Sequence, residues 1–207
     1  MKLTLYIVRH GQTIDNIEHR IQGHTDSPLT QLGIQQAQAI ARRLADERFA
    51  AIYSSDLGRA AQTAQVIVNA QNPQQQINAT ALLRELHLGL AQGLTRKEYE
   101  QKRPQEYALW ISDSVKHRPA QAESIADAVN RASGFIESVL NKHGDGDKLC
   151  VVAHGGSIRA MLISALDLPH DCHRKLSTSN TGLTILEVGD NPRLRLCNDT
   201  SHLDAAS

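Results

Sequence analysis

The sequence predicts an α/β fold in which a mostly parallel central sheet is covered by helices on both faces. Short apolar runs typical of strands alternate along the chain with longer segments in which apolar residues recur at helical spacing. The clearest strand-like runs are almost continuously apolar, as expected for strands buried on both faces. At 207 residues, the chain is long enough for one domain with a large core.

A buried strand is expected first, at residues 3–8, because LTLYIV combines aliphatic, β-branched and aromatic residues. The polar, irregular residues 12–27 are expected to form a loop. A helix follows Pro28, with Thr30 as its predicted N-cap. The apolar face of this helix is predicted to hold Ile34, Ala37, Ala41, Leu44 and Ala45.

A second strand-and-helix unit follows the same plan. Residues 50–54 (AAIYS) are the predicted strand, and the next helix is expected to begin at Ser55-Asp56. Pro73 lies in a polar loop after this helix, and residues 77–81 are a candidate short strand. The apolar face of the helix is predicted to hold Ala60, Ala61, Ala64, Ile67 and Val68.

Residues 89–121 interrupt this alternation. The segment contains Gly93, Pro104, Trp110 and Pro119 among many charged residues, and its apolar residues follow no clear period. We therefore expect a helix-and-loop lid insertion at about residues 89–121, over one end of the sheet. Residues 1–207 are expected to form a single domain that includes this insertion.

The last third of the chain returns to the regular pattern. Ser124 is the predicted N-cap of a long helix, and residues 149–153 (LCVVA) are the third clear strand. Another helix is expected to run through about Leu166. Residues 183–188 and 193–197 are predicted strands, and the second alternates polar and apolar residues in the way typical of an edge strand.

Composition argues against several classes of partner. The chain has 22 Lys and Arg and 22 Asp and Glu, without the basic excess typical of nucleic-acid or membrane-surface binding. Aromatic residues make up 3% of the chain, too few for a platform that stacks bases. The three cysteines form no C-x-x-C pair, and no run resembles a signal peptide or a membrane span. We expect a cytoplasmic protein that binds neither nucleic acid nor membrane, and nothing in the sequence specifies an oligomeric state.

Unusual polar residues follow three of the predicted strands. Arg9 and His10 follow the first strand, Arg59 lies one turn into the helix after the second, and His154 follows the third. In an open α/β sheet, ligands bind outside the carboxyl ends of the strands. The two arginines and two histidines are therefore expected to converge on one place.

Two arginines beside two histidines indicate an anion pocket that contains a nucleophile. Arginine presents a rigid fork of donors that suits phosphate oxygens, and a neutral imidazole can accept a phosphoryl group covalently. Gly155-Gly156-Ser157 opens a helix, whose free N–H groups also favour an anion. A lone histidine or arginine is more often structural, but the joint occurrence at several strand ends favours chemistry.

Four sequence blocks resemble the histidine phosphatase superfamily, in its phosphoglycerate mutase-like branch. The first is LYIVRHGQT, followed by Asn16, by R-x-Q-G at residues 20–23 and by DSPLTQLG. The others are SSDLGRAAQTA, LRELHLG and VVAHGG, in the order typical of the family. The resemblance covers nearly the whole chain and implies a three-layer α/β/α sandwich on a mainly parallel sheet.

The resemblance also implies a role for each matching residue. His10 matches the phosphorylated nucleophile, Arg9 and Arg59 match the phosphate clamps, and His154 matches the second pocket histidine. Glu85, in LRELHLG, matches the residue that donates a proton to the leaving group. The positions that line the phosphate pocket correspond to Asn16, Gln22, Gly23 and Gly155. The family needs no metal, so neither a metal ligand nor a cofactor is expected.

These roles imply hydrolysis of a phosphomonoester in two steps. His10 attacks phosphorus through a neutral nitrogen, while the two arginines and His154 stabilise charge on the phosphoryl oxygens. Glu85 protonates the leaving alcohol, and water then hydrolyses the phosphohistidine with Glu85 as base. The alternative for Glu85 is a salt bridge with Arg84 or with lysines of the lid.

Two departures from the family bear on the substrate. Ala91-Gln92-Gly93 stands where broad-specificity phosphatases of the family often carry Trp-Glu-Gly. Ile111-Ser112 follows Trp110, where mutases of the family carry an arginine pair that holds the substrate carboxylate. We therefore predict a phosphomonoester hydrolase that acts on a small phosphorylated metabolite, with a cofactor-dependent phosphoglycerate mutase as the alternative.

Other assignments fit the residues less well. The chain has no C-x5-R motif, and Ser157 lacks G-x-S-x-G surroundings. A non-catalytic phosphate-binding protein on this fold is the second alternative, but it would be expected to lose the nucleophile or the acid, and this chain keeps both His10 and Glu85. The cations of the lid segment suggest an anionic substrate, unless they only form a solvated face; they are Arg96, Lys97, Lys102, Arg103, Lys116, His117 and Arg118.

Overall fold

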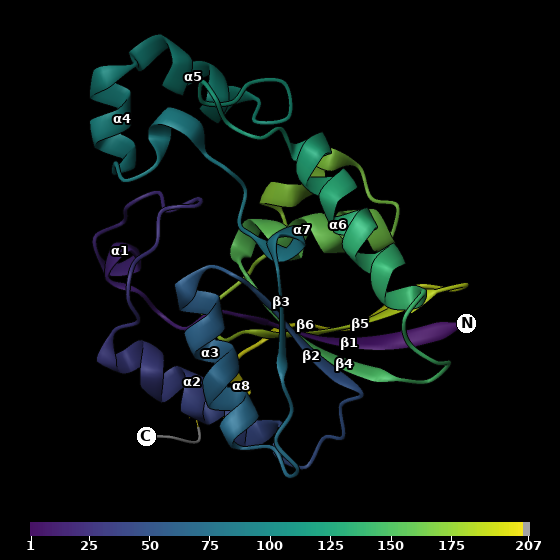
Figure 1. Ribbon diagram of the computed structural model, residues 1–207. Helices are drawn as coiled ribbons and strands as arrows, with labels where there is room; N and C mark the ends of the chain where they lie inside the picture. The colour runs from purple at the N-terminus through teal and green to yellow at the C-terminus, as the bar shows by residue number, and fades with distance from the viewer. Residues whose placement is uncertain (205–207) are drawn as a thin grey trace.

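A six-stranded sheet lies between two layers of helices in the computed structural model, which describes residues 1–204 (Figure 1). The strands are β1 (Lys2–Arg9), β2 (Ala51–Ser55), β3 (Ile77–Thr80), β4 (Lys148–Ala153), β5 (Leu183–Gly189) and β6 (Arg193–Asp199). Their order in the sheet is β3-β2-β4-β1-β5-β6. β1, β2, β3 and β4 run parallel, and β5 runs antiparallel to its neighbours β1 and β6, so the predicted mostly parallel sheet is confirmed.

Helices cover both faces of this sheet, which confirms the predicted α/β/α layering (Figure 1). The long helices are α2 (Gln31–Arg43) and α3 (Gly58–Asn69) on one face, and α6 (Ile125–Leu140) and α7 (Gly155–Ala165) on the other. The shorter helices are α1 (Ile14–Ile17), α4 (Arg96–Lys102), α5 (Pro104–Ser112), α8 (Ser201–Asp204), η1 (Ala81–Leu83), η2 (Gly89–Ala91) and η3 (His170–Arg174). Within residues 1–204, no helix combines the length and the apolar character needed to cross a membrane.

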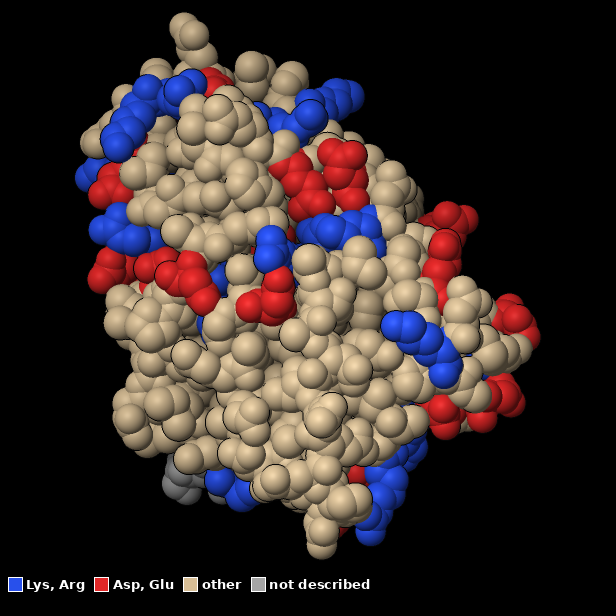
Figure 2. Space-filling model, viewed as in Figure 1, with Lys and Arg blue, Asp and Glu red and all other residues tan. Residues whose placement is uncertain are grey.

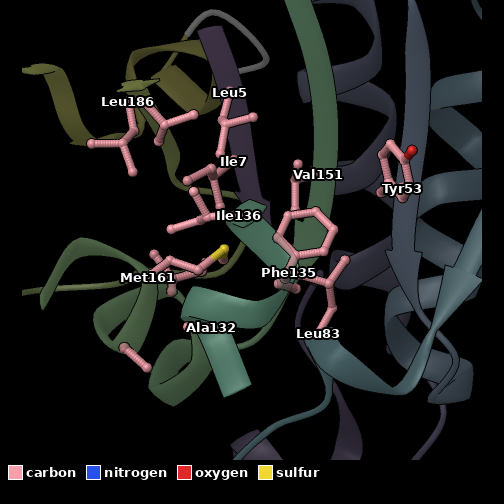
Figure 3. Close-up of a cluster of buried hydrophobic side chains, with 14 of the residues drawn as sticks. Leu5, Ile7, Tyr53, Leu83, Ala132, Phe135, Ile136, Val151, Met161 and Leu186 are labelled. Carbon is pink, nitrogen blue, oxygen red and sulfur yellow. The ribbon is translucent and has the colours of Figure 1, made fainter. Parts of the chain in front are cut away.

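Strand β1 illustrates how the sequence specifies two buried faces. Leu5 and Ile7 belong to the cluster formed with α6 and α7, whereas Tyr6 and Val8 belong to the cluster formed with α2 and α3. Successive side chains of a strand point to opposite faces, so a strand between two helical layers must be apolar at almost every position. Figure 3 shows Leu5 and Ile7 facing the same cluster as Phe135 of α6.

The face of α2 differs in part from the predicted one. Thr30 is the N-cap as expected, and its hydroxyl accepts a hydrogen bond from the Gly33 N–H at 2.9 Å. Of the predicted apolar face, Ala37, Ala41 and Leu44 are buried. Ile34 is 37% exposed, and Ala45 is exposed because it lies beyond the end of the helix.

Helix α3 begins at Gly58, with Leu57 as N-cap, rather than at Ser55-Asp56 as predicted. The cap comes from a distant loop, since the Asp26 carboxylate accepts hydrogen bonds from the N–H groups of Gly58 at 2.6 Å and Arg59 at 3.3 Å. A carboxylate at a helix N-terminus is stabilised by the free N–H groups and the helix dipole. A cap supplied across 32 residues leaves no local signal in the sequence.

Residues 89–121 contain η2, α4 and α5, which lie together at the top of Figure 1. Their packing centres on Tyr99, which is fully buried and contacts the rings of Tyr107 and Trp110 edge-on, at centroid distances of 6.5 and 6.1 Å. Ser124 then begins α6 with a capping box, as predicted.

Candidate active site

The carboxyl ends of β1 and β4 bring His10 and His154 together. The two strands are parallel neighbours with Arg9 opposite Ala153, so the residues that follow lie at the same edge of the sheet. The His10 N–H donates to the Ala153 carbonyl at 3.0 Å, which holds the two strand ends in this register. The imidazole centroids are 5.1 Å apart, and the side chains are buried, with His10 2% and His154 0% exposed.

Arg9, which is partly buried, and Arg59, which is fully buried, are cations of this site. Arg59 is 1% exposed, and its guanidinium donates to the carbonyls of Gly23 and Thr25, both at 2.8 Å. Arg9 donates through Nη1 to the Thr178 carbonyl at 2.6 Å. Burial lowers the pKa of both guanidinium groups, which nevertheless stay charged because an arginine starts so far above neutral pH.

The His10 ring is held as one neutral tautomer. Nδ1 lies 2.7 Å from the Gly11 carbonyl oxygen, and because a carbonyl only accepts, Nδ1 carries the proton and donates it. Burial holds the pKa of His10 well below its usual value, and the charges of Arg9 and Arg59 lower it further. Nε2 therefore keeps its lone pair at neutral pH, which makes this nitrogen chemically suited to act as a nucleophile.

The polar atoms around His10 include several that are buried and without a hydrogen-bond partner in the described chain. Four of them are Nε of Arg9, Nε of Arg59 and both ring nitrogens of His154. The fifth is Oε1 of Gln22, the residue before Gly23, whose carbonyl accepts a hydrogen bond from Arg59. Buried polar groups in folded proteins are almost always paired, so a group of five such atoms marks a ligand site. Two guanidinium groups so close together, those of Arg9 and Arg59, suit an anion with several oxygens, such as a phosphoryl group.

Burial lowers the pKa of His154 well below its usual value, and the neighbouring His10 and the arginines lower it further. A neutral His154 can donate one ring N–H to an anion and leaves the other nitrogen as an acceptor.

Asn16 lies in α1, a short helix within the stretch 12–27 that was predicted to be a loop, and Gly23 lies in the loop between α1 and α2. Oδ1 of Asn16 accepts hydrogen bonds from the Thr13 N–H at 3.1 Å and from the Asn180 side chain at 3.2 Å. Gly23 has a φ of +54°, and a Cβ there would overlap the side chain of Gln92. Gln92, one of the residues that depart from the family pattern, thus packs directly against the loop that carries Gly23.

Glu85 lies at the N-terminus of α7. Its carboxylate accepts hydrogen bonds from the N–H groups of Gly156 at 3.0 Å and Ser157 at 3.2 Å. Arg84 instead pairs with Asp56 at 2.6 Å, and Glu85 forms no salt bridge with any residue in the range 1–204. The salt bridge to Arg84 or to lysines of the lid, which was the alternative for Glu85, is therefore not formed.

Two glycines permit these close approaches. A Cβ at Gly156 would overlap Oε1 of Glu85, so only glycine lets the carboxylate reach the helix terminus. A Cβ at Gly155 would lie 3.1 Å from Oγ1 of Thr178 and 3.7 Å from Nε of Arg9, which makes this wall of the site tight as well.

A cavity of about 850 Å³ opens beside Asn16, Glu85 and Gly156. His10, His154, Arg9 and Arg59 do not line it, so the cavity lies next to the buried histidines and arginines and does not include them. Its apolar wall comes mainly from α6, α7 and the segment after Glu85, with Leu86, Leu88, Ile125, Ala128, Ala160 and Ile163. This volume is typical of sites for small organic ligands.

The charge lining this cavity is positive. Its three carboxylates are already engaged: Glu18 pairs with Arg20, Glu123 pairs with Arg131, and Glu85 is bound by backbone N–H groups. Five cations in the lining have no carboxylate within 4 Å among residues 1–204; they are Arg96, Lys97, Arg118, Arg159 and Arg174. Figure 2 shows Lys and Arg side chains over the upper part of the molecule, where α4 and α5 lie, with Asp and Glu side chains among them.

Arg159, Asn180 and Asp26 contact this site, but sequence reasoning did not identify them. Arg159 donates to the carbonyl of Leu176 at 2.9 Å and to Oγ1 of Thr178 at 3.1 Å, and burial lowers its pKa. It lies only a few residues beyond His154 on α7, so the helical period could have indicated that it shares this end of the helix. For Asn180 and Asp26, only contacts between distant loops reveal the role.

No cluster of three or more His, Cys, Asp or Glu side chains suited to a metal ion occurs in the part of the chain that the structure describes.

Sequence comparison relates the chain to one large family. A family model described as histidine phosphatase superfamily (branch 1) matches residues 5–200. Phosphoglycerate mutase-like protein 4 of Arabidopsis thaliana is 36% identical over 202 residues, which cover 97% of this chain and 86% of that protein. Probable phosphoglycerate mutase GpmB of Yersinia pestis is 32% identical over 208 residues, which cover 98% of this chain and 95% of that protein.

Solved structures show the same similarity. YhfR of Bacillus stearothermophilus superposes with a TM-score of 0.90 at 32% identity, covering 97% of this chain and 99% of that one. A mycobacterial glucosyl-3-phosphoglycerate phosphatase in complex with VO3 gives 0.85 at 32% identity, with coverages of 94% and 98%. A variant of phosphoserine phosphatase from Entamoeba histolytica in complex with phosphoserine gives 0.85 at 28% identity, with coverages of 97% and 99%.

Proposed function

Because the chain belongs to the histidine phosphatase superfamily, we propose that it hydrolyses a small phosphomonoester through a phosphohistidine formed on His10. The observation that carries this proposal is the state of the His10 ring. Nδ1 donates to the Gly11 carbonyl, and Nε2 is left as a neutral, buried lone pair beside two arginines with unpaired Nε groups. This arrangement supports nucleophilic attack on a bound phosphoryl group.

In the first step, Nε2 of His10 forms a bond to phosphorus and the bond between phosphorus and the ester oxygen breaks. The guanidinium groups of Arg9 and Arg59 and a ring N–H of His154 stabilise the charge on the phosphoryl oxygens. The proton that the leaving oxygen needs comes from Glu85, which lines the cavity that holds the alcohol. The products of this step are the free alcohol and phosphohistidine.

In the second step, water attacks the phosphohistidine and the bond between nitrogen and phosphorus breaks. Glu85, now a carboxylate, takes a proton from the water, and inorganic phosphate leaves. The side chains of Asn16 and Gln22 and the backbone of Gly23 and Gly155 line the phosphate in both steps. All groups with a role in this proposed scheme come from the chain itself, and activity in excess EDTA tests it.

We assign residues 89–121 the role of a lid over the leaving group. Support comes from Arg96, Lys97, Trp110 and Arg118, which belong to this segment and line the cavity beside Glu85. The positive lining favours a substrate whose alcohol part also carries negative charge.

The second candidate is a phosphoglycerate mutase, since two relatives carry that name in part. A mutase must keep its product bound while the product is phosphorylated again. Ile111 and Ser112 stand where an arginine pair would hold the carboxylate, which favours hydrolysis over phosphoryl return.

The experiment that tests the proposed function traps the phosphoenzyme. The wild-type chain is mixed with radiolabelled nitrophenyl phosphate in excess EDTA and quenched at alkaline pH, because phosphohistidine is labile in acid. We expect label on the wild-type protein and none on His10→Ala, together with loss of turnover. Turnover by His10→Ala near the wild-type rate, or activity that requires an added divalent ion, would refute the mechanism.

A further inference from the structure

Residues 176–182 form a loop, between η3 and β5, that contacts the two residues at the end of β1. The Thr178 carbonyl accepts a hydrogen bond from Arg9 at 2.6 Å, and the Thr181 N–H donates to the Arg9 carbonyl at 3.0 Å. Between them, Nδ2 of Asn180 donates to the His10 carbonyl at 3.0 Å. This loop therefore holds the backbone on which the nucleophile is carried.

The same nitrogen of Asn180 also reaches Asn16, where it donates to Oδ1 at 3.2 Å. The orientation of both amides follows from backbone groups of fixed polarity. The His10 carbonyl can only accept, so Asn180 must turn Nδ2 toward it. The Thr13 N–H can only donate, at 3.1 Å, so Asn16 must turn Oδ1 toward it and toward Asn180.

With Oδ1 of Asn16 held by two donors, Nδ2 of Asn16 faces the other way. It has no hydrogen-bond acceptor among residues 1–204. Because the same nitrogen of Asn180 joins Oδ1 of Asn16 to the His10 carbonyl, Asn16 lies between the backbone of His10 and the cavity beside Glu85. If the Asn16 amide were turned the other way, its oxygen would face away from Thr13 and Asn180 and would repel a phosphoryl oxygen. In the observed orientation, the N–H group on that side is a donor that can bind a phosphoryl oxygen. The choice between these two states of Asn16 rests on Thr13 and Asn180.

We propose that Asn180 is a positioning residue that keeps the side-chain N–H of Asn16 aimed at the phosphoryl group. This inference rests on the proposed function, because it assumes that a phosphoryl group binds beside His10. Asparagine meets the requirement, since it offers two donors from one nitrogen at this distance from the backbone. Aspartate has the same shape but cannot donate, and alanine removes the contact altogether.

A double-mutant cycle between Asn180→Ala and Asn16→Ala tests the proposal. Two quantities are measured for each protein: kcat/KM for nitrophenyl phosphate, and the dissociation constant of inorganic phosphate by calorimetry. We expect each single variant to lower kcat/KM about tenfold and to raise the dissociation constant of phosphate about tenfold, as for the loss of one hydrogen bond to a charged group. If Asn180 acts through Asn16, both quantities in the double variant also differ from the wild type by about tenfold, rather than by the product of the two single losses.

Two further variants complete the experiment. Asn180→Asp keeps the shape of the side chain and removes its donors, so we expect it to weaken phosphate binding at least as much as Asn180→Ala. Ser179→Ala is the matched control, because Ser179 belongs to the same loop but its side chain contacts Asn198. We expect this control to bind phosphate like the wild type.

Losses that multiply in the double variant would mean that Asn180 acts independently of Asn16, and would overturn the proposal. Phosphate binding by Asn180→Asp at the wild-type level would overturn it as well. A wild-type protein that neither binds phosphate nor hydrolyses the ester would instead refute the proposed function, and this assignment with it. The wild-type measurement thus separates the two failures.

Discussion

The N–H of Gly156 donates a hydrogen bond to the carboxylate of Glu85 at 3.0 Å, across 71 residues of sequence. The contact joins the segment after η1 to the first turn of α7, and thereby places a carboxyl group at the border between the buried histidines and the large cavity. Because a Cβ at Gly156 would overlap Oε1 of Glu85, the position of the acid depends on this glycine.

Replacing Gly156 by alanine is expected to displace Glu85 while leaving His10 and the arginines in place. The rate of hydrolysis of an alkyl phosphate should fall by about 10- to 100-fold, because a displaced Glu85 loses part of the contribution of general acid catalysis. The rate with nitrophenyl phosphate should fall much less, because its leaving group hardly needs a proton. Steady-state rates with the two esters measure the difference. Gly134→Ala is the control, since a Cβ there meets no atom within 4 Å; equal losses in Gly156→Ala for both esters would contradict the prediction.

The variant Glu85→Gln tests the proton donor through the leaving group. An alkoxide needs a proton in order to leave, whereas a nitrophenolate hardly does, so the variant should slow phosphoenzyme formation from an alkyl phosphate by ~10²–10⁴-fold and from nitrophenyl phosphate far less. The burst phase measures this step apart from the later attack by water. If Glu85 were only structural, the burst rates with the two esters would fall alike.

The phosphatase and mutase candidates differ in what happens to 3-phosphoglycerate. With Ile111 and Ser112 in place of an arginine pair, we expect release of inorganic phosphate to be faster than formation of 2-phosphoglycerate, even with a bisphosphoglycerate primer. Both products are measured in the same reaction. Isomerisation faster than phosphate release would favour the mutase.

Arg159 should select substrates with a second negative charge. Its Nε and Nη2 are held by Leu176 and Thr178, while Nη1 has no hydrogen-bond acceptor in the described residues of the cavity wall. The ratio of kcat/KM for phosphoserine to that for phosphoethanolamine, which lacks the carboxylate, should fall by about tenfold or more in Arg159→Met, as for loss of a charge-assisted hydrogen bond.

Arg159 also donates hydrogen bonds to Leu176 and Thr178 in the loop next to Arg9. Nitrophenyl phosphate, which has no carboxylate, is therefore the reference substrate that reports any general loss of activity in the variant. Lys175→Met is the matched control, since Lys175 is an exposed cation paired with Asp171 outside the cavity. A ratio unchanged in Arg159→Met would show that this arginine only supports the loop.

The stability of the ligand-free protein should fall as the pH falls below about 6.5, the pKa of a histidine in an unfolded chain. Burial holds the pKa values of His10 and His154 well below this, so the unfolded chain binds protons on them that the folded protein does not. The free energy of unfolding should therefore fall by about 1.4 kcal/mol per pH unit for each of them. Urea unfolding between pH 5.5 and 7.5 measures the slope, which His154→Asn should reduce; an unchanged slope in this variant would contradict the assignment.

The sequence by itself was sufficient for features that follow from local order along the chain. The strands at residues 3–8 and 149–153 were predictable because a strand between two helical layers is apolar at nearly every position. His10 and His154 could be expected to lie together because each directly follows one of these parallel strands, and such strands end at the same edge of the sheet. The N-caps Thr30 and Ser124 were predictable because a cap contacts only the next turn.

Tertiary structure alone decided the contacts between segments that are distant in sequence. Asp26 caps α3 across 32 residues, so the start of that helix was predicted too early. Asn180 meets Asn16 across 164 residues, and Gly156 meets Glu85 across 71. Such contacts depend on how loops from several strands pack at one edge of the sheet. The local sequence around these residues does not indicate which distant residue each of them will contact. The strand ends thus follow from sequence, while the side-chain orientations that support the chemistry follow from the packing of the loops around them.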